Sequence, residues 1–366
     1  MAWPIFRGLF DDASLFPPAS LAMADAVAGH LHHQTAWYRE MSGPFVCADT
    51  NITELRAALT AAGLAELDLA LVLPGGVAGL DAAVDGVFSD PRLRLRAVEV
   101  PAAARDSITT AVAEVAAALD RTPLAGAAAF IEVPARDFTT AAARAVDERR
   151  YLAKVRTGGT TAQAVPDDQT LANCLVTMAQ ARLAFKCTAG VHHAVRHRAA
   201  DTGFEHHGFL NVLLAVAAAL DDASPEQVAA ELADRDAARV AAKIRNLDAE
   251  TVSAVRSRSP RSAPAVPTSR STTWLRLALS ARTSRQLAPV CLTHLRSCQP
   301  AGSVQRPPDV SADPMRPANM ARFIFMNPAV TERDGQPVRK PTVWRAERRI
   351  FRVIRAPLRG MRVAAD

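Results

Sequence analysis

Apolar runs and amphipathic stretches alternate along the first 255 residues of the chain. Seven runs rich in Val, Leu, Ile and Phe have the length of β-strands, and Ala-rich stretches with helical spacing lie between them. The predicted strands are residues 6–10, 44–48, 67–73, 93–100, 127–133, 151–156 and 183–188. The predicted helices are residues 21–41, 52–62, 80–88, 103–119, 139–149, 169–181 and 209–220, and a further helix opens at Ser224-Pro225-Glu226. This alternation is typical of parallel β/α units.

Seven such units within 255 residues match the size of an eight-stranded barrel. The alternative is an open doubly wound sheet, which usually has fewer strands and a glycine-rich nucleotide turn after the first strand. Residues 9–13 contain no such glycines. We therefore predict an α/β fold, a (β/α)8 TIM-barrel-like domain over residues 1–255. Its eighth unit is expected to be missing or scrambled, because no convincing strand follows Glu250.

Charge and composition change abruptly near Arg256. From that residue onward the sequence has 21 basic and 6 acidic residues, out of 43 and 37 in the whole chain. The part before it is therefore acidic, although the pI of the whole chain is about 9.4. Ser, Arg, Pro and Thr crowd residues 256–366, and such a composition buries too little apolar surface to offset chain entropy. We predict a disordered basic tail.

The tail has the composition that arises when a GC-rich gene is translated out of frame. Moving the frame by one base lets residues 259–279 be read as FTSFGTCSPDEPLDDLAALGL. That string contains a short strand, an acidic turn and an amphipathic helix, which are the parts of an eighth unit. Our hypothesis is a frameshift, and resequencing of the locus tests it. A chain lacking its eighth strand would expose two sheet edges, so we expect low stability and no activity.

The rival interpretation makes the tail a functional arm. Arg348, Arg352, Arg355 and Arg359 recur at helical spacing with apolar residues between them, which is typical of a basic amphipathic helix. Such a helix binds phosphates of nucleic acid or of a membrane surface. Nucleic acid is expected as a partner only through this tail.

The remaining composition favours a cytoplasmic protein with no membrane partner. The N-terminus lacks a basic region followed by an apolar run, so no signal peptide is expected. The longest apolar stretch, residues 210–220, is shorter than the ~20 residues that cross a bilayer. The five cysteines are scattered without metal-type spacing, as is usual for reduced thiols.

Charged residues occur inside the predicted strands. Lys154 and Arg156 share one face of the sixth strand by alternation, and Lys186 and Thr188 share one face of the seventh. Glu99 and Glu132 occupy comparable places in the fourth and fifth strands. If all the charged side chains point inward, three cations meet two anions at the barrel mouth. Such a cluster is either a structural ion-pair network or a site.

The glycines that follow these two strands suggest an anion site. Thr157-Gly158-Gly159 ends the sixth-strand segment, and Thr188-Ala-Gly190 ends the seventh. Small residues allow tight turns whose main-chain N–H groups face an anion. The predicted substrate-binding residues are Arg156, Thr157, Gly158, Gly159, Thr188, Gly190 and Arg196.

The segments Lys154-Val-Arg-Thr-Gly-Gly and Lys186-Cys-Thr-Ala-Gly-Val resemble the sixth- and seventh-strand segments of deoxyribose-phosphate aldolase, a class I aldolase barrel. The likeness departs from that family at Arg156, where a small residue is usual, and at His192-His193. It implies that Lys154 forms an imine and that Lys186 is the neighbouring cation that lowers its pKa. The chain as a whole resembles actinobacterial barrel-like proteins with similar segments and no established activity.

Five of the nine histidines lie within 16 residues, in the segment after the seventh strand. Imidazoles and a carboxylate in one loop can bind a divalent metal or move protons near neutral pH. The alternative metal ligands are His192, His193, His197, Glu205, His206 and His207. His30, His32 and His33 in the first helix are expected to be surface residues.

These features predict a barrel enzyme that acts on a small anionic carbonyl or phosphorylated metabolite, in the manner of a Schiff-base aldolase or lyase, without a cofactor. Lys154 would be the nucleophile, and Arg156 and Lys186 would hold negative charge. Protons would be moved by Glu132 or Glu99 and, from the loop, by His192 or His193. The alternatives are a metal-dependent lyase or hydrolase that uses the histidine loop, and a non-catalytic protein that binds anions.

Overall fold

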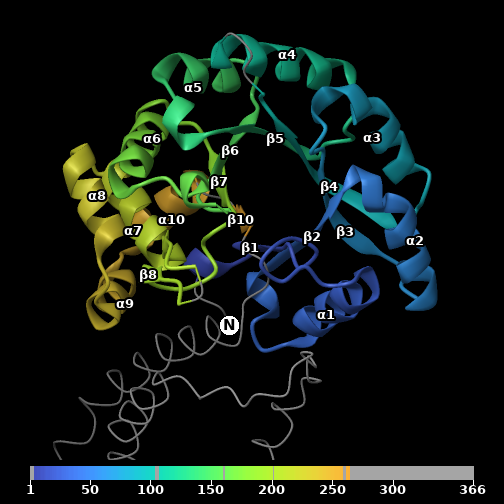
Figure 1. Ribbon diagram of the computed structural model, residues 1–366, viewed down its shortest axis with the longest axis horizontal. Coiled ribbons are helices and arrows are strands. Elements are labelled where there is room, and N and C mark those ends of the chain that lie inside the picture. Colours follow the sequence, from blue (N-terminus) through green and yellow to red (C-terminus); the bar gives the residue numbers. More distant parts are fainter. Residues whose placement is uncertain (1–3, 104–106, 160, 201, 259–260, 264–366) are drawn as a thin grey trace, which may run out of the picture. The chain divides into compact units, whose positions relative to one another are not determined.

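Eight parallel strands form a closed ring in the computed structural model (Figure 1). The structure describes residues 4–103, 107–159, 161–200, 202–258 and 261–263. Around the ring the strands follow the order β1-β10-β7-β6-β5-β4-β3-β2. Their bounds are β1 (Phe10–Asp12), β2 (Ser42–Ala48), β3 (Leu67–Val72), β4 (Leu93–Pro101), β5 (Ala128–Val133), β6 (Leu152–Arg156), β7 (Phe185–Thr188) and β10 (Arg261–Ala263). The α/β barrel-like fold expected from the sequence is confirmed.

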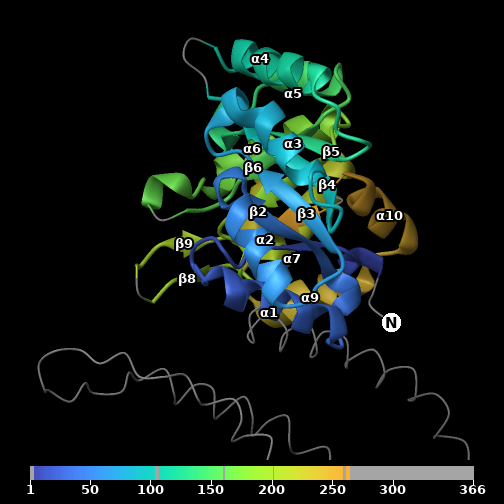
Figure 2. The same ribbon diagram turned by 90° about the vertical axis from the view of Figure 1, so that its right-hand side faces the viewer.

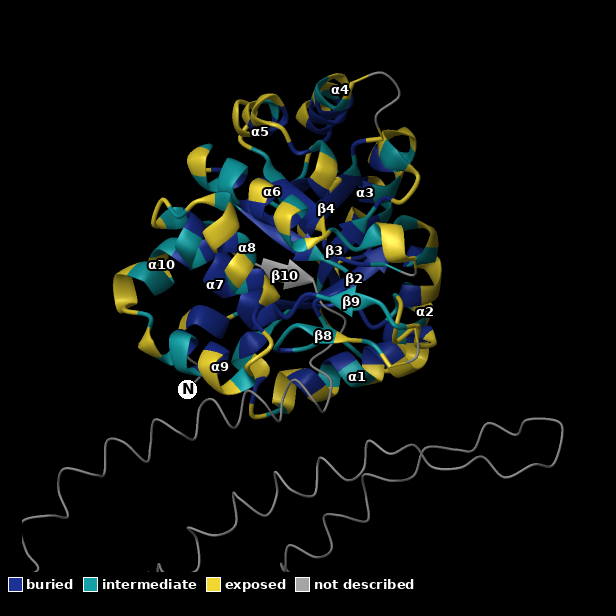
Figure 3. Cartoon of the chain, turned by 60° about the vertical axis from the view of Figure 1, so that its left-hand side comes forward, coloured by how far each residue is buried: buried dark blue, intermediate teal, exposed yellow. Residues whose placement is uncertain are grey.

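Helices lie outside the ring, and the exposed residues gather on their outer faces (Figure 3). Their bounds are α1 (Met23–Thr35), α2 (Ile52–Ala61), α3 (Leu80–Phe88), α4 (Ile108–Arg121), α5 (Thr140–Asp147), α6 (Asp168–Gln180), α7 (Phe209–Leu220), α8 (Pro225–Ala233), α9 (Ala237–Asn246) and α10 (Ala249–Arg258). The Ser224 side chain and Gln227 form a capping box at the start of α8. The helical spacing and the cap chemistry of the sequence thus predicted α1 to α8, with a first helix that ends earlier than expected, whereas α9 and α10 were not predicted.

The first strand lies later in the chain than the apolar pattern predicts. Residues 4–6 form a 3-10 helix, and β1 begins only at Phe10 and continues through Asp11 and Asp12. Ile5 and Leu9 are nevertheless buried in the core. The apolar run at residues 6–10 therefore marks burial and not the strand. The strand itself carries the carboxylates of Asp11 and Asp12, which are buried and bonded to other side chains in the folded chain.

The eighth position of the ring is filled by β10, a strand of three residues. Arg261, Ser262 and Ala263 pair with residues 186–188 of β7, and Ser262 also pairs with Phe10 of β1. The eighth unit is thus reduced to a short strand that follows α10. This strand pairs with β1 and β7, whose edges we expected to be exposed. Apart from 256–258 and 261–263, the predicted tail lies outside the described residues.

Two apolar clusters make up the core. The larger one fills the layer between the strands and the helices and includes Phe45, Leu69 and Ile131. The smaller one consists of Ala13, Val46, Ala70, Ala97 and Phe130. Because adjacent strand residues point to opposite faces, these residues of β2 to β5 point into the ring, where charged residues of β6 and β7 also project. The interior of the barrel therefore combines a small apolar cluster with charged side chains.

Two connections extend from the same end of the barrel. A hairpin of β8 (His197–Arg198) and β9 (Glu205–His206) lies between β7 and α7, and in the side view it projects in the same direction as the loop after β6 (Figure 2). Nowhere in the described ranges is a helix long and apolar enough to cross a bilayer.

Candidate functional site

Lys154 of β6 lies at the mouth of the barrel between two carboxylates. Its Nζ is 2.8 Å from Oε2 of Glu99 on β4 and 2.7 Å from Oε2 of Glu132 on β5. Glu132 is the register neighbour of Lys154, which explains the direct contact between adjacent strands. Arg156, two residues further along β6, donates from Nη2 to Oε1 of Glu132 at 2.8 Å. The sequence-predicted face of β6 is therefore the inner face.

Lys186 of β7 lies deeper in the barrel and is fully buried. Its Nζ is 2.6 Å from Oδ2 of Asp11 on β1 and also bonds Oε1 of Glu99. The ammonium group stands 5.0 Å from the centre of the Phe130 ring, within the range of a cation–π contact. Glu99 thus links Lys186 to Lys154, one lysine on each of its oxygens.

These side chains form one charge cluster of Asp11, Glu99, Glu132, Lys154, Arg156 and Lys186. The excess of one cation that we expected is wrong, because Asp11 contributes a third anion from β1. Sequence reasoning missed this residue because it placed the first strand too early in the chain. Three cations and three anions leave the cluster neutral, which lowers the cost of burying it.

The buried carboxylates stay ionised because the cations outweigh burial. Burial alone would raise the pKa of Glu99, but Lys154 and Lys186 together lower it to about 2. Burial also opposes the charge of Lys186, yet Asp11 and Glu99 raise its pKa above the ordinary value. For Glu132, Lys154 and Arg156 overcome the effect of burial and lower the pKa. Lys186 is therefore a permanent cation whose charge is already matched by two carboxylates.

A pocket of about 370 Å³ opens above Lys154. The charged residues in its lining are Glu99, Glu132, Lys154 and Arg156, and Gly159, Thr188 and His192 line the side of the β6 and β7 loops. Apolar residues of the early strands, among them Val46 and Val72, complete the wall. Lys186 is sealed below the pocket, so Lys154 is the lysine that a ligand in the pocket can reach.

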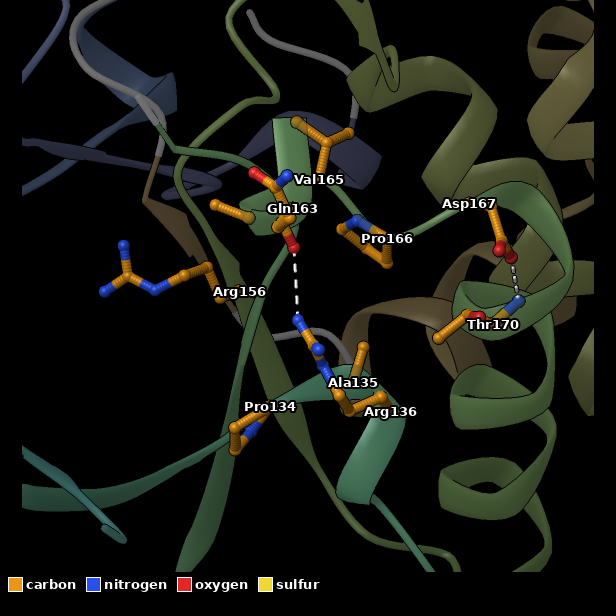
Figure 4. A pocket seen from close by; sticks show the side chains of 10 residues that line it. Pro134, Ala135, Arg136, Arg156, Gln163, Val165, Pro166, Asp167 and Thr170 are labelled. Atoms are coloured by element: carbon orange, nitrogen blue, oxygen red, sulfur yellow. Dashed lines mark hydrogen bonds between the residues drawn. The ribbon is translucent and has the colours of Figure 1, made fainter. Parts of the chain in front are cut away.

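A second hollow lies on the outer side of Arg156. It has a volume of about 330 Å³ and is lined by Arg136, Arg156, Gln163 and Asp167 among others (Figure 4). Arg136 donates from Nη2 to the main-chain oxygen of Gln163 at 3.1 Å, and Asp167 accepts from the main-chain nitrogen of Thr170 at 2.7 Å. Arg156 therefore stands on the wall between this hollow and the Lys154 pocket.

The loops after β6 and β7 pack directly against each other through glycines. A Cβ on Gly158 would overlap the Cα of Gly190, and Gly190 has a φ of 78°. The main-chain N–H of Thr157 donates to Thr188 at 2.8 Å, and that of Gly190 donates to Nε2 of His192 at 3.3 Å. These two N–H groups are thus used within the protein, contrary to the expectation that both turns present them to an anion.

The close approach of the two loops makes Gly158 sensitive to substitution. Gly158→Ala is expected to lower the free energy of unfolding by about 1–3 kcal/mol, because the added methyl meets main-chain atoms of Gly190. Chemical denaturation measures the change. Gly86→Ala on α3 is the control, since a Cβ there meets no atom within 4 Å and alanine favours a helix. Equal stability of Gly158→Ala and the unmodified chain would contradict the packing.

The histidine segment divides into two sets. His193, His197 and His206 lie in a row, with ring centres 3.8 and 5.5 Å apart, and they share one pocket with His192. His192 also lines the Lys154 pocket, whereas His207 lines neither of these pockets and is buried with its Nε2 2.8 Å from the main-chain oxygen of Pro166. Among the described residues no three His, Cys, Asp or Glu side chains converge in a metal-binding arrangement. The alternative metal site on His192, His193, His197, Glu205, His206 and His207 is therefore not favoured by the geometry.

Arg196, which we predicted to bind substrate, bonds three neighbouring elements. Its Nη1 bonds Asp168 at the start of α6, and its Nε lies 3.6 Å from Glu205 of β9. Its main-chain nitrogen donates to Oδ1 of Asn211 on α7 at 2.8 Å. These bonds attach the hairpin to two helices, and the part of Arg196 in substrate binding stays a prediction.

The first helix contributes a buried imidazole that sequence reasoning assigned to the surface. His30 is 1% exposed, and its Nδ1 lies 3.0 Å from Oδ2 of Asp12 on β1. His33 is also buried and bonds the hydroxyl of Tyr38 at 2.8 Å, whereas His32 is exposed as expected. Asp11 and Asp12 thus point to opposite faces of β1, one into the charge cluster and one toward α1.

Comparison of the chain with protein families, with curated proteins and with solved structures finds no match. The chemistry available to the site follows from its side chains. An amine, a half-exposed guanidinium, two carboxylates and the imidazole of His192 meet at one pocket. Such a set can attack a carbonyl, hold a negative group and move protons.

Proposed function

We propose that this protein is an enzyme that forms a Schiff base between Lys154 and a small anionic carbonyl compound, as a carbon–carbon lyase does. The observation that supports it most directly is the contrast between the two lysines. Lys154 lines the pocket and touches two carboxylates, whereas Lys186 is sealed beneath it. A nucleophile has to be accessible and needs a base near it.

Glu132 is the base that this proposal assigns to Lys154. Only a neutral amine attacks a carbonyl, so the ammonium group must first give a proton to a carboxylate. Glu99 is a poor acceptor, because two lysines lower its pKa to about 2. Glu132 is 2.7 Å from Nζ, and one of the cations that lower its pKa is the exposed Arg156. When Arg156 turns to the anionic group of a substrate, Glu132 loses that cation and becomes a better base.

The bond changes in the proposed reaction are those of imine formation and retro-aldol cleavage. The neutral amine of Lys154 adds to the carbonyl carbon, the oxygen leaves as water, and a protonated imine remains. The bond that then breaks joins the carbon next to the imine carbon to the hydroxyl-bearing carbon that follows it. Its electron pair passes to the imine nitrogen to give an enamine. The hydroxyl proton of the departing fragment goes to a base, a role that we assign to His192, whose imidazole lines the pocket.

The anionic group of the substrate is placed toward Arg156. Two residues along a strand separate Arg156 from Lys154 by roughly 6–7 Å, a distance that a chain of a few carbons spans. Gly159 lines the pocket and donates no main-chain hydrogen bond to another described residue, so its N–H group is available to the same anion. Arg156, Gly159 and Thr188 therefore keep their predicted part in substrate binding, whereas Gly158 is packed against Gly190 and does not line the pocket.

Borohydride trapping tests the proposal. The chain has four lysines, Lys154, Lys186, Lys243 and Lys340, so peptide mass spectrometry identifies the modified one unambiguously. Incubation with pyruvate, acetaldehyde or dihydroxyacetone phosphate, followed by borohydride, is expected to label Lys154 with at least one of them. Lys154→Met should lose the label, and Lys243→Met, which alters a surface pair with Glu231, should keep it. Absence of a label at Lys154 with all three carbonyls, or equal labelling of Lys243, would refute the proposal.

A further inference from the structure

A separate pocket lies against the histidine hairpin, and we call it the histidine pocket. Its volume is about 360 Å³. It is lined by Pro17, Pro18, Gly159, Ala189, Gly190, His192, His193, His197, Ala199, Thr202, Phe204 and His206. None of these lining residues carries a permanent charge, in contrast to the four charged residues around the Lys154 pocket. The two pockets therefore suit different chemical groups.

Flat rings form one wall of the histidine pocket. The His193 and His197 rings are 3.8 Å apart with planes tilted by 42°, and the His197 and His206 rings are stacked with an angle of 21°. Phe204 is the aromatic residue of the hairpin turn and completes this side. Because rings this close leave no space between them, another planar ring would meet their outer faces or edges, by offset stacking or edge contacts.

The central imidazole of this wall, that of His197, is uncharged. Burial, together with the neighbouring His193 and His206, lowers the pKa of His197 to about 4, so this ring is neutral at pH 7. A neutral imidazole has one donor and one acceptor nitrogen. One nitrogen of His197 bonds the main chain of Val195, and its Nδ1 is buried without a hydrogen-bond partner among the described residues. A ring with nitrogen or oxygen atoms at its edge can bond this atom, whereas a purely apolar ring cannot. A lining without a permanent charge is a poor site for phosphate or carboxylate, which need cationic partners.

The histidine pocket adjoins the Lys154 pocket. Pro17, Gly159, Ala189 and His192 line both. A ligand that enters the Lys154 pocket past His192 therefore has a second space within reach, and each space is of the size that binds a small organic group. The loop with its hairpin is long enough to cover such an extended ligand.

We propose that the histidine pocket binds an uncharged, nitrogen-containing aromatic ring of nucleobase size, as the second part of a substrate whose carbonyl reaches Lys154. The position of the ring within a substrate rests on the proposed function of Lys154, but binding of the ring itself does not. Adenine alone is therefore a suitable probe, because it has a planar ring, edge nitrogens and no carbonyl or phosphate.

Histidine ring signals in NMR spectra of the full-length protein test this proposal at pH 7.5. Adenine is expected to shift the signals of His197 and His206 in a saturable way and to leave that of His32 on α1 unchanged. Phe204→Ala should weaken adenine binding at least tenfold, whereas Phe88→Ala, which removes an exposed ring of α3, should not. Thr202→Trp, which fills the pocket without removing a buried side chain, should abolish the shifts.

Three results would overturn the inference. The first is the absence of saturable shifts with adenine, and the second is equal binding of cyclohexanol, which has no planar ring. The third is adenine binding that survives Thr202→Trp. Lys154→Met is expected to bind adenine as the unmodified chain does, so failure of the Schiff-base proposal and failure of this one are separate results.

Discussion

Lys186→Met is expected to lower the free energy of unfolding by about 3–5 kcal/mol, because it leaves Asp11 buried without its ammonium partner. Methionine fills nearly the same volume, so the loss arises from charge and not from a cavity. For a domain of this size, each 1 kcal/mol lowers the melting temperature by roughly 2–4 °C. Denaturant titration and calorimetry measure both quantities.

A double-mutant cycle with Asp11→Asn isolates the contact between the two residues. The double variant removes both charges together, so its loss should be smaller than the sum of the single losses by about 2 kcal/mol. Lys243→Met is the matched control, since its pair with Glu231 is partly exposed and contributes about 0–1 kcal/mol. Additive losses for Asp11→Asn and Lys186→Met would show that the two side chains do not interact.

Glu99→Gln is expected to cost a similar 3–5 kcal/mol, because one carboxylate holds both lysines and the amide has no charge to replace it. The matched control is Glu66→Gln at an exposed pair with Arg94, which should change stability by less than about 0.5 kcal/mol. A loss below about 1 kcal/mol for Glu99→Gln would contradict a charge cluster at this position.

The pH dependence of stability gives a second measure of Glu99. Its pKa is about 2 in the folded protein and 4.5 when unperturbed, so the folded state binds this proton less readily. The stabilisation is therefore complete above pH 4.5 and is lost as the pH falls toward 2. Glu99→Gln should remove this part of the acid dependence, and its stability should approach that of the unmodified chain at the acid end. Parallel pH profiles for the two proteins would argue against the lowered pKa.

The order of elements and the inner faces of β6 and β7 were predictable from the sequence. Apolar alternation marks β2 to β7, and helical spacing marks most of the helices, because these patterns depend on neighbours within one element. The same alternation placed Lys154 and Arg156 on one face, and parallel strands brought them to the end of the barrel where Glu132 also lies. Strand alternation therefore identified five of the six residues of the charge cluster, all but Asp11.

Other features follow from contacts between distant parts of the chain, which no local pattern records. Asp11 lies 175 residues from Lys186 and becomes recognisable as its partner only when the ring is closed. The eighth strand has three residues without an apolar signature, and its pairing depends on the edges of β1 and β7. His30 looks like a surface residue until β1 brings Asp12 against it.

The sequence by itself thus determined the repeating units, the type of fold and the inward faces of β6 and β7. Only the tertiary structure decided the charge balance of the cluster, the sealing of Lys186 and the separation of the histidines into different groups. The physical reason is that backbone periodicity is a local property, whereas burial and charge pairing depend on which residues meet once the chain has closed into a barrel.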